Sequence, residues 1–102
     1  MSIPRYARNL DDAQLEEVAG QFRLLGEPMR LKILQALCAR PLPVGDIVAA
    51  TGATQSNVSK HLSLMASAGI VSRHKEGQFV YYGMKNPLTM KLCELVHKEL
   101  LR

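Results

Sequence analysis

Hydrophobic residues recur at helical spacing near both ends of the chain. Between residues 12 and 25 they return every three or four positions, and Asp11 followed by Gln14 is typical of a helix start. Asn86 and Pro87 predict the start of a C-terminal helix with a stripe of the same kind. The two stripes consist of Leu15, Val18, Ala19, Phe22 and Leu25, and of Leu88, Leu92, Leu95, Val96 and Leu100.

Three shorter helices are predicted between these two. Pro28 begins one that ends before the breaker sequence RPLP, and a second covers residues 44–50. Thr54 is a suitable N-cap for a third helix, which runs to Ser67. The inner face of the helix after Pro28 is expected to carry Leu31, Leu34, Leu37 and Cys38.

Two strands complete the predicted order. Residues 70–75 and 78–84 have the composition of strands joined by a hairpin turn at Glu76 and Gly77. The elements then follow the order α-α-α-α-β-β-α, which is a mainly α fold with a small β-hairpin. Neither a linker nor a repeat divides the chain, so residues 1–102 are predicted to form a single domain.

The helix that follows Thr54 carries no carboxylate on its polar side. At 100° per residue its apolar side carries Val58, Leu62 and Met65, and the opposite side Ser56, Lys60, Ser63 and Ser67. No Asp or Glu occurs between Asp46 and Glu76, although a solvated helix face usually mixes both charges. Because DNA phosphates repel carboxylates, the pattern predicts a helix that enters the major groove of DNA. The preceding short helix and Gly-containing turn complete a helix-turn-helix, and the basic hairpin after it makes the motif winged.

Composition and charge narrow the function. With 47% hydrophobic and 22% charged residues, the 102-residue chain has the composition of a globular domain. A formal charge of +4 and a pI near 9.3 favour a polyanionic partner, whereas the absence of Trp argues against a stacking platform for single strands. No apolar run is long enough to cross a membrane and the first residues do not form a signal peptide, so a cytoplasmic protein with reduced thiols is expected.

Three stretches closely resemble the ArsR/SmtB-type winged-helix repressors: FRLLGEPMRLKILQAL, VGDIVAATGATQSNVSKHLSLMASAGIV and RHKEGQFVYYGM. The resemblance covers roughly residues 21–84. It implies a cytoplasmic homodimer that binds double-stranded operator DNA and leaves it when a small inducer binds. The helix-turn-helix would cover about residues 43–68 and the wing about 70–84, with dimerisation helices at about 11–25 and 86–101.

Candidate DNA contacts lie on the helix after Thr54 and on the wing. They are Gln55, Ser56, Asn57, Ser59 and Lys60 on the helix, and Arg73, His74, Lys75 and Gln78 on the wing. Asn and Gln suit adenine and Lys suits guanine, but which of these side chains contact bases stays open, and an ordinary solvated surface is the alternative. We expect His61 to be a partly buried structural residue. For Arg30 and Lys32, phosphate contact and a solvated face are equally open.

The usual metal-sensing motifs of the family are missing. Pro43 and Gly45 stand where many members carry Cys-x-Cys, and Asn86-Pro87-Leu88 stands where others carry Asp-x-His. Neither a metal nor a cofactor is therefore predicted. Cys93 and His97, four residues apart, are weak candidates for half of a metal site shared between protomers.

Cys38 and Cys93 are candidates for a redox or reactive-sulfur switch. A thiol-sensing branch of the family is similar in carrying one Cys on the second helix and one on the last, where Gln35 and Leu101 would be the matching positions. Both cysteines here are displaced from those positions. The alternative is two small buried side chains.

A homodimeric, inducible transcriptional repressor is the leading interpretation. The alternatives are a metal-responsive repressor with a non-standard site and a winged-helix module that binds an acidic protein or RNA. An enzyme is not expected, because the three histidines lie far apart in sequence and no nucleophile elbow or phosphate loop occurs.

Overall fold

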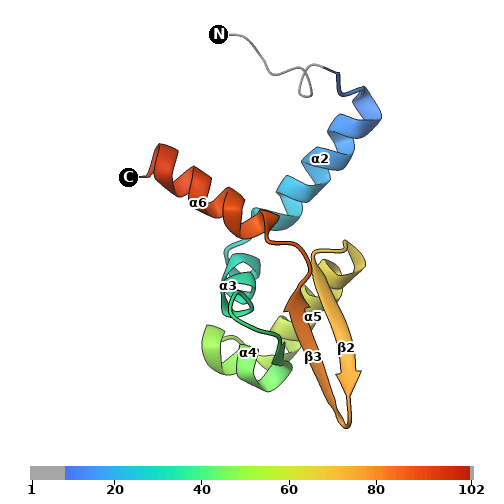
Figure 1. The fold of residues 1–102 in the computed structure, drawn as a ribbon, viewed down its shortest axis with the longest axis vertical. Coiled ribbons are helices and arrows are strands. Elements are labelled where there is room, and N and C mark those ends of the chain that lie inside the picture. The colour runs from blue at the N-terminus through green and yellow to red at the C-terminus, as the bar shows by residue number, and fades with distance from the viewer. Residues whose placement is uncertain (1–8, 102) are drawn as a thin grey trace.

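The computed structural model describes residues 9–101, in which two long helices extend from a small winged body (Figure 1). The elements in chain order are α2 (Asp12–Leu25), α3 (Pro28–Ala36), β1 (Leu42–Pro43), α4 (Val44–Thr51), α5 (Gln55–Ser67), β2 (Val71–Glu76), β3 (Phe79–Met84) and α6 (Leu88–Leu100). The predicted mainly α fold and the order of its helices and hairpin are confirmed, with the short β1 as an addition. None of the helices within residues 9–101 is long and apolar enough to cross a membrane.

Local sequence signals start and end the helices as predicted. Asp11 Oδ1 accepts a hydrogen bond from Gln14 N at 2.8 Å, and Gln14 Oε1 accepts one from Asp11 N at 3.0 Å, which completes a capping box before α2. Thr54 Oγ1 accepts a hydrogen bond from Asn57 N at 3.2 Å and so caps α5. Gly52 ends α4 with a φ of +74°, in the left-handed region that favours glycine.

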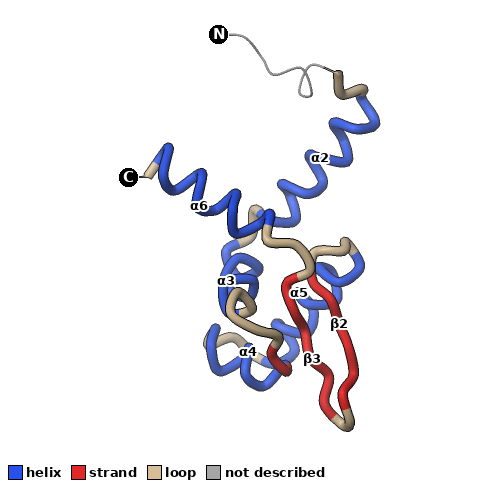
Figure 2. Tube along the Cα trace, viewed as in Figure 1, coloured by secondary structure: helices blue, strands red, loops and turns tan. Residues whose placement is uncertain are grey.

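The sheet has three antiparallel strands in the order β1-β3-β2, and β2 and β3 project from the body as the wing, residues 71–84 (Figure 2). The turn of the wing lies at Gly77 and Gln78, so the predicted turn at Glu76 and Gly77 is wrong by one residue. Glu76 still pairs with Phe79, and Gly77 reverses the chain with a φ of +64°.

Three further boundaries differ from the prediction by one residue, the first being the end of α4 at Thr51 instead of residue 50. Ile70 precedes β2 because its N–H donates to the carbonyl of Met65 at 2.9 Å, which leaves it bonded to the end of α5. The last helix begins at Leu88, with Pro87 at the N-cap position. Asn86 still satisfies a free donor of that helix, since its Oδ1 accepts from Leu88 N at 2.9 Å.

The hydrophobic core lies within the winged body. Its buried members come from α3, α4, α5, the sheet and adjoining segments, and they are Ile33, Leu34, Leu37, Leu42, Ile47, Val58, Leu62, Met65, Ile70 and Val71. The predicted apolar side of α5 is confirmed, because its three members are fully buried. The inner face of α3 was predicted correctly at Leu34 and Leu37, but Leu31 is only half-buried. Cys38 is exposed, since α3 ends at Ala36 and Cys38 lies beyond Leu37, the C-cap residue and the last one of this segment in the core.

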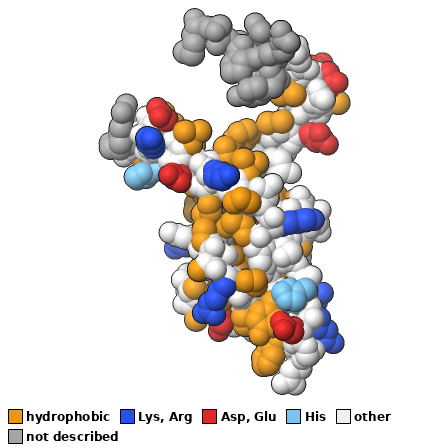
Figure 3. Space-filling model, in the orientation of Figure 1, with side chains coloured by type: hydrophobic (Ala, Val, Ile, Leu, Met, Phe, Trp, Pro, Cys, Tyr) orange, Lys and Arg blue, Asp and Glu red, His pale blue; other side chains and the backbone are white. Residues whose placement is uncertain are grey.

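The helices α2 and α6 lie at the edge of that core, against which Leu24, Leu25 and Met90 pack as partly buried side chains. No residue of α2 is buried, and Thr89 is the only buried residue of α6. The chain has a radius of gyration of 15.5 Å, whereas a compact domain of 100 residues has one of about 13 Å. Hydrophobic side chains gather along α2 and around its junction with α6 (Figure 3). Most of the apolar stripe on each of these helices is therefore not covered by the rest of the chain.

Candidate nucleic-acid interface

The helix α5 presents a polar surface on the side opposite its buried residues. Of the predicted contacts on it, Gln55, Ser56, Asn57 and Lys60 are exposed and Ser59 is half-buried. The first turn contains no acid, and Ser56 Oγ lies 3.5 Å from Thr54 Oγ1. Since the N-terminal end of a helix carries a partial positive charge, this end of α5 is suited to approach phosphates.

The predicted wing residues lie on two opposite faces of the hairpin. Arg73 pairs with Tyr82 across the strands and shares a face with Val71, which is buried in the core next to α5. Lys75 lies on that same face, because alternate residues of a strand point to the same side. We call this the inner wing face. His74 lies on the outer wing face and therefore does not share a surface with Arg73 and Lys75.

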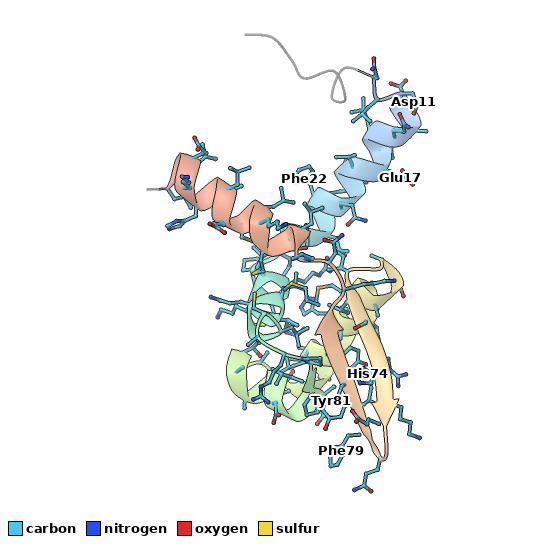
Figure 4. All side chains as sticks on the ribbon, in the orientation of Figure 1. Asp11, Glu17, Phe22, His74, Phe79 and Tyr81 are labelled. Carbon is cyan, nitrogen blue, oxygen red and sulfur yellow. The ribbon has the colours of Figure 1, made fainter. Side chains whose placement is uncertain are left out.

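Neighbouring side chains hold Arg73 and His74 in different ways. Arg73 Nε donates a hydrogen bond to Tyr82 Oη at 3.3 Å. His74 stacks on Tyr81 with 5.7 Å between ring centroids, and its Nε2 lies 3.7 Å from Glu76 Oε2 (Figure 4). The outer wing face is therefore less basic than the inner one.

The tip of the wing carries an aromatic side chain that the sequence did not single out. Phe79 is 54% exposed and lies near the turn, next to the exposed Gln78 (Figure 4). The signal that could have found it is its position directly after the hairpin turn, where a side chain cannot reach the core. Phe79 therefore adds an exposed apolar side chain to the tip of the candidate interface.

His61 is partly buried as predicted, with a side-chain exposure of 12%. Its Nδ1 accepts a hydrogen bond from Arg30 Nε at 3.1 Å. Arg30 is half-buried and hydrogen-bonded within the protein, so it does not lie on a solvated face, whereas phosphate contact by its guanidinium stays a prediction. Lys32 is exposed.

The two cysteines lie in different surroundings. Cys93 is half-buried and, together with His97, lines an apolar groove of about 480 Å³ between α2, α3 and α6. Cys38 is exposed near the end of α3, so the alternative of a buried core residue is wrong for it. Both thiols are free. Among residues 9–101, no group of three or more His, Cys, Asp or Glu side chains is arranged to hold a metal ion.

Comparison of the sequence with known proteins identifies a family. Residues 27–73 match the family of bacterial regulatory proteins described as the arsR family. The chain is 35% identical over 94 residues to the cadmium resistance transcriptional regulatory protein CadC of Listeria innocua, and the match covers 91% of this chain and 79% of that protein. The chain belongs to the ArsR family. It is an ArsR-family DNA-binding transcriptional repressor, and this family consists of transcriptional regulators, which are not enzymes.

Solved structures of similar proteins have the same winged-helix fold as this ArsR-family chain. NolR from Sinorhizobium fredii aligns with a TM-score of 0.78 at 25% identity, over 98% of this chain and 96% of that one. The homodimeric winged helix-turn-helix domain of Mb0332 from Mycobacterium bovis aligns with a TM-score of 0.77 at 28% identity, over 100% and 93% of the two chains.

Proposed function

We propose that this ArsR-family repressor binds its operator as a homodimer whose interface is formed by α2 and α6. The single observation that carries the proposal is that both helices have apolar stripes left largely uncovered by their own chain. Phe22 is 60% exposed, Leu95 54% and Leu100 75%. Because burial of apolar surface contributes about 25 cal/mol per Å², pairing these helices with those of a second copy would stabilise both protomers.

The occupant of the apolar groove is proposed to be the second copy of this chain. The groove lies beside the uncovered stripes and has residues of both in its lining, among them Phe22, Leu25, Leu92 and Val96. A two-fold axis brings the same surface of each protomer together, so one self-complementary apolar surface is enough to close a dimer. The homodimeric state named for the Mycobacterium bovis relative supports this arrangement.

In the proposed complex, α5 of each protomer enters the major groove and the inner wing face contacts the adjacent backbone. The exposed, acid-free start of α5 supports the first contact. The position of Arg73 and Lys75 on the face next to α5 supports the second. Two recognition helices related by a two-fold axis must lie about 34 Å apart to enter successive major grooves on one side of the duplex.

Release by a thiol-reactive inducer is the second part of the proposal. Cys93 lines the groove that the second copy is proposed to occupy, so atoms added to its sulfur would alter the packing of α6 against α2, α3 and the partner. A link from Cys93 to the exposed Cys38 would require their Cα atoms to come within about 7 Å. A metal ion bound by Cys93 and His97 and completed by the partner is the competing inducer.

A binding assay with a selected operator tests the proposed function. The operator is isolated from a random duplex library with the full-length protein, and binding is then compared with that of a shuffled duplex at a fixed salt concentration. We expect the operator to contain two inverted half-sites and to bind at least about 1,000-fold more tightly than the shuffled duplex. Equal affinity for both duplexes would contradict specific operator binding.

A further inference from the structure

One arginine connects the end of α2 with the recognition helix. The Nη1 group of Arg30 donates to the carbonyl of Leu24 at 3.0 Å, and its Nε donates to His61 Nδ1 at 3.1 Å. Leu24 lies in the last turn of α2, where carbonyl groups have no partner within the helix. The same guanidinium therefore satisfies α2 on one side and holds α5 on the other, although Arg30 itself belongs to α3.

Glu27 completes this contact. Its Oε2 accepts a hydrogen bond from Arg30 N at 3.0 Å and lies 3.8 Å from His61 Nε2. Because Arg30 donates to Nδ1, the neutral ring carries its hydrogen on Nε2, on the side toward Glu27. Glu27 thus caps α3 and faces the imidazole, so the short connection between α2 and α3 lies beside the middle of α5.

We propose that Arg30 is a positioning residue that fixes the orientation of α5 relative to α2, and thereby the distance between the two recognition helices of the dimer. The inference rests on the proposed function, in which α2 belongs to the dimer interface and α5 to the DNA interface. A guanidinium suits this role because it is planar and its donors point in fixed directions. A lysine at this position would keep the charge but could not hold both acceptors in one geometry.

The consequence for DNA is a strict preference for one half-site spacing. Moving one half-site by a base pair changes the separation by about 3.4 Å and rotates the half-site around the helix axis. A dimer with rigidly placed recognition helices cannot adjust to both the new separation and the new rotation. A dimer with a loosened contact between α2 and α5 can adjust to them in part.

The test measures affinity across a series of operators in which the spacing between half-sites is changed by one base pair at a time. Arg30→Met removes both hydrogen bonds, and His61→Leu removes only the one to α5 while a side chain of similar size fills the space. His61→Asn restores an acceptor close to the position of Nδ1. Lys32→Met is the matched control, because it removes an exposed cation from the same helix. Thermal melting establishes that each variant is folded.

We expect the wild type to lose about tenfold in affinity when the spacing changes by one base pair. Arg30→Met and His61→Leu should reduce that ratio to about twofold, while His61→Asn and Lys32→Met keep the wild-type ratio. Folded Arg30→Met and His61→Leu proteins that keep the wild-type ratio, or that lose affinity equally at every spacing, would overturn the role of Arg30 and leave the proposed function standing. A wild type without any spacing preference would instead overturn the two-site arrangement of the proposed function, and the role of Arg30 with it.

Discussion

A substitution at Ser56 is a simple test of whether the acid-free side of α5 faces DNA. Ser56 is exposed in the first turn of α5, on the side away from Val58 and Leu62. A carboxylate at this position would face phosphates and add repulsion where the wild type has a small hydroxyl. We expect Ser56→Glu to weaken operator binding by about a hundredfold without lowering the melting temperature.

The matched control is Ser56→Gln, which has the size of glutamate without its charge. It should bind the operator much more tightly than Ser56→Glu, as measured by fluorescence anisotropy on the same duplex. Near-normal affinity of a folded Ser56→Glu protein would show that this side of α5 does not meet DNA.

The thiols give a second test at the residue scale. If Cys38 and Cys93 form the switch, polysulfide should join their sulfur atoms, with the loss of one hydrogen from each thiol and reduction of the polysulfide to sulfide. Intact-mass analysis detects the product, and operator release should accompany it. Cys38→Ser and Cys93→Ser should each abolish the response while the untreated variants still bind DNA. Unmodified thiols and undiminished operator binding after treatment would contradict the thiol mechanism.

Single residues were predictable only where their surroundings are local in sequence. The buried positions of α5 follow from helical periodicity, and the caps at Asp11 and Thr54 follow from neighbours three residues away. The surroundings of Arg30 were missed because its partner His61 is 31 positions later in the chain. Cys38 was misplaced because periodicity cannot show that α3 ends at Ala36.

At the scale of elements, the wing is expected to bind the DNA backbone through one face. Arg73 and Lys75 share the inner wing face. Arg73→Gln and Lys75→Gln should each weaken binding to all duplexes similarly and reduce the slope of log affinity against log salt by about one. Lys85→Gln, which removes an exposed cation just beyond β3, serves as the control and should leave the slope unchanged. Unchanged slopes for both wing variants would contradict phosphate contact by the inner face.

DNA contacts by the other two candidate residues of the wing, His74 and Gln78, stay predictions.

Most elements could be predicted from the sequence, and those that could not depend on distant pairing. The helices carry their own caps and stripes, so their existence and order follow from local signals. The two-residue β1 has no such signal and exists because it pairs with Tyr81 and Tyr82 of β3. Alternation along β2 follows from strand geometry alone. Which of the two sides is the inner wing face depends on the burial of Val71. That burial results from long-range packing and cannot be derived from the strand alone.

At the scale of the whole molecule, the proposed dimer accounts for the extended shape of the single chain. Phe22 lines the groove shared with α6, whereas Glu17 lies on the opposite side of α2 (Figure 4). Phe22→Glu places two buried charges in a two-fold interface, one from each protomer, and removes apolar contacts from both. We expect the dimer dissociation constant to rise at least a hundredfold, by about 3 kcal/mol or more.

The control for this variant is Glu17→Gln, which changes the charge of α2 on its other side and should leave the dimer intact. Sedimentation equilibrium over a range of protein concentrations measures both. The same dissociation constant for Phe22→Glu and the wild type would place the interface elsewhere.

The central claim, a homodimer that spans two half-sites through α2 and α6, is tested most directly by sedimentation velocity of the full-length wild type with and without its selected operator duplex. The account predicts a dimer at micromolar protein concentration and a complex of two protomers with one duplex. A monomer at that concentration, with no gain in protein association when the duplex is added, would contradict it.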